Sequence, residues 1–141
     1  MATLGRAWHK PRGVALDVAP AALYLALLFW AGLIPLKSLP GPDFALADKV
    51  WHLMAFGGLA GLLSRALRHF GRPTLTAARD AALVATALGG LLEILQSFTA
   101  YRSADWADFL ADSVGTALAY GALRGLHAVA TAAEARPKGL A

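Results

Sequence analysis

Residues 81–98 read AALVATALGGLLEILQSF, an apolar run interrupted by a single carboxylate, Glu93. A helix rises about 1.5 Å per residue, so the run is long enough to cross a hydrocarbon core of about 30 Å. Leu and Ala dominate it, and both residues favour helix over strand. The segment therefore predicts a membrane-spanning helix with an ionisable group inside it.

Three other runs have a similar length and composition, at residues 18–36, 50–67 and 106–126. The connectors at residues 37–49 and 68–80 contain Pro and Gly, which favour turns. No linker or repeat divides the chain. We therefore predict that residues 1–141 form one all-α domain, a polytopic membrane protein built as a four-transmembrane-helix bundle.

The composition supports a membrane location and excludes other classes. Hydrophobic residues make up 57% of the chain, charged residues 16%, and the mean hydropathy is +0.53. Such a chain is too apolar to cover a soluble domain of this size. The net charge of +4 is spread between the apolar runs and forms no basic stripe, so we predict no nucleic-acid partner. The absence of cysteine excludes disulfides and thiolate metal sites.

The distribution of Lys and Arg predicts the orientation, because cytoplasmic loops carry the excess of these residues. Ten of the thirteen fall in the two tails and in the connector region between the second and third runs; Lys37, Lys49 and Arg102 fall on the other side. We predict a multi-pass protein of the bacterial cytoplasmic (inner) membrane with both termini cytoplasmic. A cleaved signal peptide is disfavoured, because the first run is too long and Ala45-Leu46-Ala47 lies too far beyond it.

Most other polar residues gather where the second, third and fourth runs meet the outer side of the membrane. Taking the helical rise, His52, Glu93 and Asp112 lie on the order of 5 to 10 Å inside the outer boundary, where an unpaired charge is costly. The predicted polar pocket comprises Asp48, Lys49, His52, Glu93, Gln96, Arg102, Asp105, Asp108 and Asp112.

Helical spacing places these polar residues on shared faces. Asp48 and His52 are four residues apart, Glu93 and Gln96 are three apart, and Asp105, Asp108 and Asp112 follow at three and four. The last two faces continue inward as small residues, which favour contacts between helices in membranes. The faces should therefore point inward and form an acidic pocket at the outer leaflet. A helix dipole would explain Asp105 and Asp108 without a functional role, but Asp112 lies two turns inside the helix.

The ordered set of these residues resembles the VanZ-like family, named after a teicoplanin-resistance protein. The resemblance covers roughly residues 48–120, and Asp112 stands where the family pattern has Asn. It implies a small membrane protein of the bacterial cell envelope, with reduced teicoplanin susceptibility as the family phenotype. The segments that carry it are DKVWH (48–52) with Phe56, EILQ (93–96), RSADWAD (102–108), and Asp112 with Gly115.

Three functions are compatible with the pocket. The first is binding of a lipid-linked or glycopeptide ligand at the outer leaflet of the lipid bilayer, with lowered susceptibility to glycopeptides such as teicoplanin. The second is an intramembrane hydrolase or transferase acting on a lipid-linked envelope precursor, with Glu93 or Asp112 as general base and His52 as acid or ligand. The third is a polar network that serves only assembly. Whether the protein is an enzyme stays open at this point.

No motif predicts a cofactor. A divalent metal at His52, Glu93 and Asp112 is the alternative, because imidazole and carboxylate ligands suit Zn, Mn or Mg. The ligands would have to come from three helices, since the chain has no H-E-x-x-H spacing.

Overall fold

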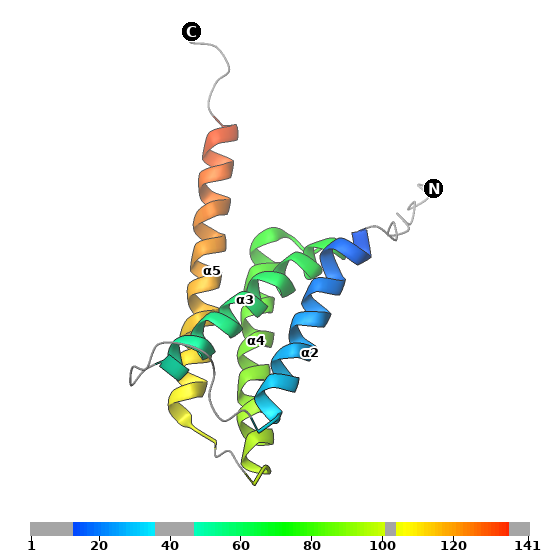
Figure 1. The fold of residues 1–141 in the computed structure, drawn as a ribbon. Coiled ribbons are helices and arrows are strands. Elements are labelled where there is room, and N and C mark those ends of the chain that lie inside the picture. Colours follow the sequence, from blue (N-terminus) through cyan, green and yellow to red (C-terminus); the bar gives the residue numbers. More distant parts are fainter. Residues whose placement is uncertain (1–12, 36–46, 101–103, 136–141) are drawn as a thin grey trace, which may run out of the picture.

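The computed structural model describes residues 13–35, 47–100 and 104–135, and this part of the chain contains helices and no strand. The prediction of an all-α fold is therefore confirmed for these residues. Arg102, the signal-peptide motif at residues 45–47 and most of both tails lie outside the described ranges or at their edge. The helices are η1, Val14–Val18, a π-helical turn that continues into α2, Ala19–Leu33; α3, Ala47–His69; α4, Thr74–Ser97; and α5, Trp106–Glu134 (Figure 1).

Three of the helical segments are long and apolar enough to cross a membrane. They are Val14–Leu33, Ala47–His69 and Thr74–Ser97, and they correspond to the first three predicted spans. Helix α5 is longer, at 29 residues, but it is not among the three, because its sequence is less apolar and includes Asp108, Asp112 and Arg124.

The helix boundaries differ from the predicted ones where polar residues or proline intervene. The first span was expected to reach residue 36, but α2 ends at Leu33 and Ile34 is extended, with φ −97° and ψ 154°. Ile34 precedes Pro35, and the proline ring disfavours helical geometry in the residue before it. In contrast, α4 begins seven residues before residue 81, directly after Pro73, and α5 continues eight residues past 126. Arg and Ala in those extensions are good helix formers although they are not part of an apolar run.

Helix α3 has the most extensive contacts, against α5 and α4, and α2 packs against α3 and α4. Figure 1 shows α3 inclined across the other helices. The α3–α5 crossing is very close: a Cβ atom on Gly115 would overlap with the backbone oxygen of Leu53. Glycine at this position therefore sets the distance between the two helix backbones.

The apolar core is small, and many large apolar side chains face outward. Phe56, Leu59 and Ala60 of α3 pack with Ala85 and Leu92 of α4. Outward-facing apolar side chains are the expected surface of a helix in contact with lipid. Examples are Leu23, Leu27, Trp30, Leu83, Ile94 and Leu118.

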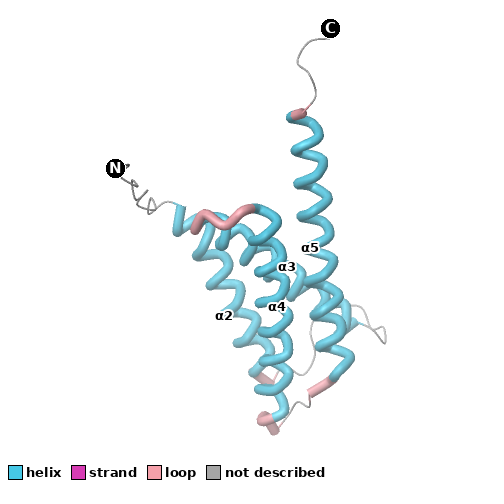
Figure 2. The backbone as a smooth tube through the Cα atoms, turned by 180° about the vertical axis from the view of Figure 1, so that it is seen from behind, coloured by secondary structure: helices cyan, strands magenta, loops and turns pink. Residues whose placement is uncertain are grey.

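The first described helix begins, and the last described helix ends, at the same end of the molecule. The start of η1 and the end of α5 lie at that end, together with the α3–α4 turn, in both views (Figures 1 and 2). There Arg65 Nε donates to Asp17 Oδ1 at 2.7 Å, and His69 Nδ1 lies 3.2 Å from Asp17 Oδ2. These contacts fasten the start of the first helix to the end of α3. Helix α5 extends beyond the other helices, and its last two turns are mostly exposed.

Candidate functional site

The polar residues singled out in the sequence lie at the opposite end of the molecule, on three helices. Asp48, Lys49 and His52 belong to the first turns of α3, and Glu93 and Gln96 to the last turns of α4. Asp105 precedes α5, and Asp108 and Asp112 occupy its first turns. Helical spacing predicted these groupings, and the structure brings the carboxylates and His52 together. Arg102 lies in the part of the chain that the structure does not describe.

Lys49 is the basic centre of the outer part of this cluster. Its Nζ donates to Asp105 Oδ2 at 2.6 Å and to Asp108 Oδ1, and it lies 3.9 Å from Asp48 Oδ2. Asp105 also caps α5, because its side chain accepts a hydrogen bond from Ala107 N at 2.8 Å. The hydrogen bond from Lys49, and then the one from Ala107, hold the pKa of Asp105 below its ordinary value.

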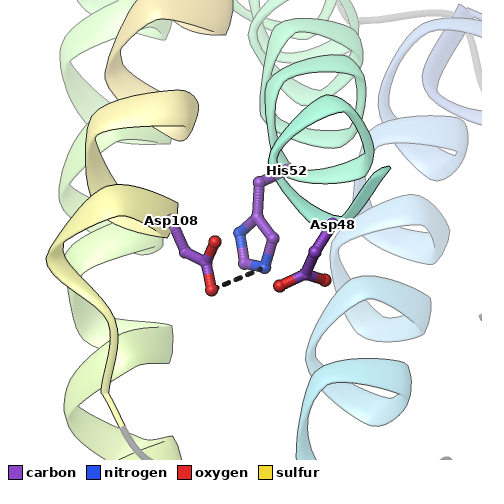
Figure 3. Close-up of side chains that lie close together, drawn as sticks. All are labelled: Asp48, His52 and Asp108. Carbon is purple, nitrogen blue, oxygen red and sulfur yellow. Dashed lines mark ion pairs between the residues drawn. The ribbon is translucent and has the colours of Figure 1, made fainter. Parts of the chain in front are cut away.

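His52 lies in the centre of the cluster. Its Nδ1 lies 3.0 Å from Asp112 Oδ1, and its Nε2 lies 3.8 Å from Asp108 Oδ2. Figure 3 shows the imidazole between the carboxylates of Asp48 and Asp108. The ring therefore contacts carboxylates on both sides, and it joins α3 to α5.

Two carboxylate oxygens in this cluster are buried and have no hydrogen-bond partner among the described residues. They are Glu93 Oε1 and Asp112 Oδ2. The Glu93 residue is 6% exposed and Asp112 is fully buried. The second oxygen of Glu93 is held, since Asp105 N donates to Glu93 Oε2 at 2.9 Å. A buried carboxylate oxygen without a partner is costly, so a proton, a water molecule, a cation or another ligand must complete it.

Gly89 makes room for the buried carboxylate of Asp112. A Cβ atom at this position of α4 would lie 2.6 Å from Asp112 Oδ2. The small residue predicted to lie inward of Glu93 thus has a definite function: it lets the α5 carboxylate approach α4.

Among the described residues, two sets of three side chains could hold a metal ion, and His52 belongs to both. One set is His52, Glu93 and Asp112, which the sequence also proposed; the other is Asp48, His52 and Asp108. In each set the potential ligand atoms lie within 4.8 Å of one another.

The side-chain amide of Gln96 contacts the end of α2. Its Nε2 donates to the backbone oxygen of Gly32 at 3.0 Å, which joins α4 to the end of α2. The residue was grouped with the carboxylates because it lies one turn after Glu93. Its amide instead satisfies a carbonyl near the C-terminal end of α2, where helices leave carbonyls unbonded.

A cavity of about 150 Å³ lies beside the carboxylate cluster, between α2, α3 and α4. Its surface is mostly apolar, and two polar side chains, His52 and Gln96, contribute to it. The α2 residues in the wall were not singled out from the sequence, because they are small or apolar and have no distinguishing pattern. The lining residues are Leu28, Ala31, Gly32, Trp51, His52, Ala55, Phe56, Leu92 and Gln96.

One of three comparisons with known proteins finds a match for the chain. Neither the search of curated proteins nor the search of solved structures finds a match for the chain. A family model described as VanZ/LLP1 matches residues 20–127, which include every residue of the carboxylate cluster and the cavity wall. The chain therefore belongs to the VanZ/LLP1 family, as the ordered polar motifs indicated.

Proposed function

We propose that the protein binds an amphiphile at the outer leaflet of the bacterial cytoplasmic membrane. The apolar part of the ligand enters the cavity between α2, α3 and α4, and its cationic head group faces the carboxylates of α3 and α5. The observation that carries the proposal is the position of His52, which lines the apolar cavity and contacts Asp112 of the acidic cluster. One side chain thus connects an apolar and an acidic compartment.

The topology that we propose has four membrane crossings, with α5 as the fourth and both termini in the cytoplasm. The start of the first helix and the end of α5 lie at one end of the molecule, as an even number of crossings requires (Figure 1). The basic residues of the α3–α4 turn region lie at the same end. Basic residues are enriched on the cytoplasmic side, so the carboxylate cluster then faces the outer leaflet. The basic residues concerned are Arg65, Arg68, Arg72 and Arg79.

The size and lining of the cavity suit part of an alkyl chain. An apolar cavity of about 150 Å³ can hold a group of about six carbon atoms. Trp51 and Leu28 contribute apolar wall, and the polar groups lie where a head group would begin.

The charges beside the cavity favour a cationic head group. Among the described residues the cluster has five carboxylates, and Lys49 is their only lysine or arginine partner. Teicoplanin carries a lipid tail, so it belongs to the class of ligand that this site fits. Binding of a lipid-tailed glycopeptide here would lower susceptibility to it.

The test compares teicoplanin with a glycopeptide that lacks the acyl tail, by calorimetric titration into the full-length protein in lipid nanodiscs. We expect the tailed compound to bind at least tenfold more tightly. Ala31→Phe, which fills the cavity, should abolish this difference, whereas Ala117→Phe on the exposed face of α5 should not. Equal binding of both compounds, or full binding by the Ala31→Phe variant, would exclude this function. Expression of the wild-type protein in a susceptible strain should raise the inhibitory concentration of teicoplanin.

A second candidate function is hydrolysis or transfer on a lipid-linked envelope precursor. The two unpartnered carboxylate oxygens beside His52 favour it, because a general base requires a free oxygen within reach of the substrate. The test is turnover of a lipid-linked diphosphate by the reconstituted protein, with Glu93→Gln expected to remove activity and the exposed Glu134→Gln to retain it. No turnover with any divalent metal would eliminate this candidate.

A further inference from the structure

His52, Glu93 and Asp112 come from three different helices and lie close together. Glu93 Oε1 and Asp112 Oδ2 are buried and unpartnered within the described part of the chain. A ligand atom from each of His52, Glu93 and Asp112 lies within 4.8 Å of the other two. We propose that these three side chains bind one divalent transition-metal cation of the Zn²⁺ or Mn²⁺ class between α3, α4 and α5.

The donor atoms suit such an ion. One imidazole nitrogen and two carboxylate oxygens are ligands that Zn²⁺ and Mn²⁺ accept. Bonds of about 2.0 to 2.2 Å require the three side chains to draw in slightly around the ion. Three protein ligands leave coordination positions for water or for a ligand.

The remaining contacts of the two carboxylates hold them in orientation. Asp105 N donates to the second oxygen of Glu93, and His52 Nδ1 lies 3.0 Å from the second oxygen of Asp112. Hydrogen bonds of this kind around the ligands commonly fix the geometry of a metal site. Asp112 lies on the Nδ1 side of the imidazole, so an ion shared by His52 and Asp112 would bind Nδ1 and replace the present contact between them.

Asp48, His52 and Asp108 form a poorer site for a cation. Lys49 Nζ donates to Asp108 and lies 3.9 Å from Asp48, so an ammonium group already occupies this set. Asp48 is also half exposed. The hydrogen bonds of Lys49 go to Asp105 and Asp108, and none in the described residues goes to Glu93 or Asp112. A cation therefore gains more at Glu93 and Asp112, where it completes buried oxygens.

This inference goes beyond amphiphile binding and does not depend on it. The wall of the cavity comes from α2, α3 and α4, whereas the ligands of the cation come from α3, α4 and α5. The purified protein should therefore bind the metal in the absence of any amphiphile.

The experiment measures metal binding by the full-length protein in nanodiscs after stripping with a chelator. Titration with ZnCl₂, MnCl₂ and MgCl₂ alone should give about one equivalent of Zn²⁺ or Mn²⁺ per chain, and the bound ion should raise the melting temperature. Glu93→Gln and Asp112→Asn should each weaken binding at least tenfold. The matched changes Glu134→Gln and His127→Ala, on the far part of α5, should leave the affinity unchanged.

Several results would overturn the assignment. Absence of stoichiometric binding by the folded wild-type protein would mean that protons or water molecules satisfy the two oxygens. Wild-type affinity in the Glu93→Gln variant would exclude Glu93 as a ligand. Glutamine keeps the shape of the glutamate side chain, so this variant still provides a test if Asp112→Asn does not fold. A tenfold loss in Asp48→Asn with none in Glu93→Gln would place the ion at the other set. Glycopeptide titration of the same preparations separates failure of the metal site from failure of amphiphile binding.

Discussion

Gly89 and Asp112 approach so closely that a Cβ atom on the glycine would lie 2.6 Å from Asp112 Oδ2. The contact joins α4 to α5 at the depth of the buried carboxylate. The atom that a Cβ on Gly89 would meet belongs to a side chain and not to the backbone. A larger residue at position 89 would therefore displace the carboxylate without separating the helices.

Gly89→Ala should therefore impair the site more than the fold. Alanine gains about 1 kcal/mol of helix propensity over glycine, and overpacking costs about 1 to 3 kcal/mol, so the two effects partly cancel. We expect a change of at most about 2 kcal/mol in unfolding free energy and at least a tenfold loss of metal affinity. Thermal unfolding and metal titration check this. Gly121→Ala is the control, because nothing lies within 4 Å of its Cβ position; equal metal affinity in both variants would contradict the prediction.

Gly115→Ala should destabilise the fold itself. The added Cβ would overlap with the backbone oxygen of Leu53, so α3 and α5 must move apart. Overpacking of this kind lowers the free energy of unfolding by about 1 to 3 kcal/mol. Because two helix backbones must move, we expect a loss at or above the upper end of this range for Gly115→Ala. Denaturant unfolding in detergent measures it. Gly125→Ala, with open space around its Cβ position, should be neutral or stabilising; a Gly115→Ala protein of wild-type stability would refute the close crossing.

Acid should weaken the link between α3 and the start of α5. Lys49 holds the pKa of Asp105 below its ordinary value, so the folded state binds this proton less readily than the unfolded state. The stabilisation is therefore present above the ordinary carboxylate pKa of about 3.9 and is lost as the pH falls through the lower folded value. Asp105→Asn keeps a capping side chain but removes the charge. The melting temperature of the wild type should exceed that of the variant at pH 7, and the difference should shrink towards pH 3. A constant difference would show that the charge of Asp105 is not involved.

Glu93→Gln distinguishes a functional cluster from one that serves assembly alone. Glutamine retains an oxygen that can accept from Asp105 N, and it removes a buried charge. We expect the free energy of unfolding to stay unchanged or to rise by up to about 2 kcal/mol. Functional groups are often kept at a cost in stability, so their replacement can stabilise a protein. Metal binding should be lost. Thermal unfolding and metal titration of the same sample test both, and extensive loss of folded protein would favour the assembly role.

Much of the fold could be predicted from the sequence, because lipid selects apolar runs of a definite length. The run at residues 50–67 lies within α3, and the run at residues 81–98 lies within α4 except for Phe98, which caps that helix. The predicted ends of the helices were less accurate, because α4 continues through a segment that contains Arg79 and α2 stops before Pro35. The fourth crossing stays a prediction, because α5 combines a long helix with buried aspartates.

The candidate site could be predicted as a set of residues but not as a set of contacts. Periodicity along each helix grouped Asp48 with His52, and Asp108 with Asp112. The pairing of Lys49 with Asp105 joins residues 56 positions apart, and helical spacing says nothing about such pairs. The cavity was missed because its α2 wall contains no polar residue. The hydrogen bond of Gln96 could not be predicted, because its partner is a backbone carbonyl, which no sequence pattern marks.

The group that holds Glu93 Oε2 is the peptide nitrogen of residue 105, not its side chain. Every amino acid except proline has this N–H, so position 105 can drift during evolution without releasing the glutamate. Proline at residue 105, or a change in the number of residues between α4 and α5, is what would release it. Variation among relatives at this position should therefore alter the capping of α5 while leaving Glu93 in place.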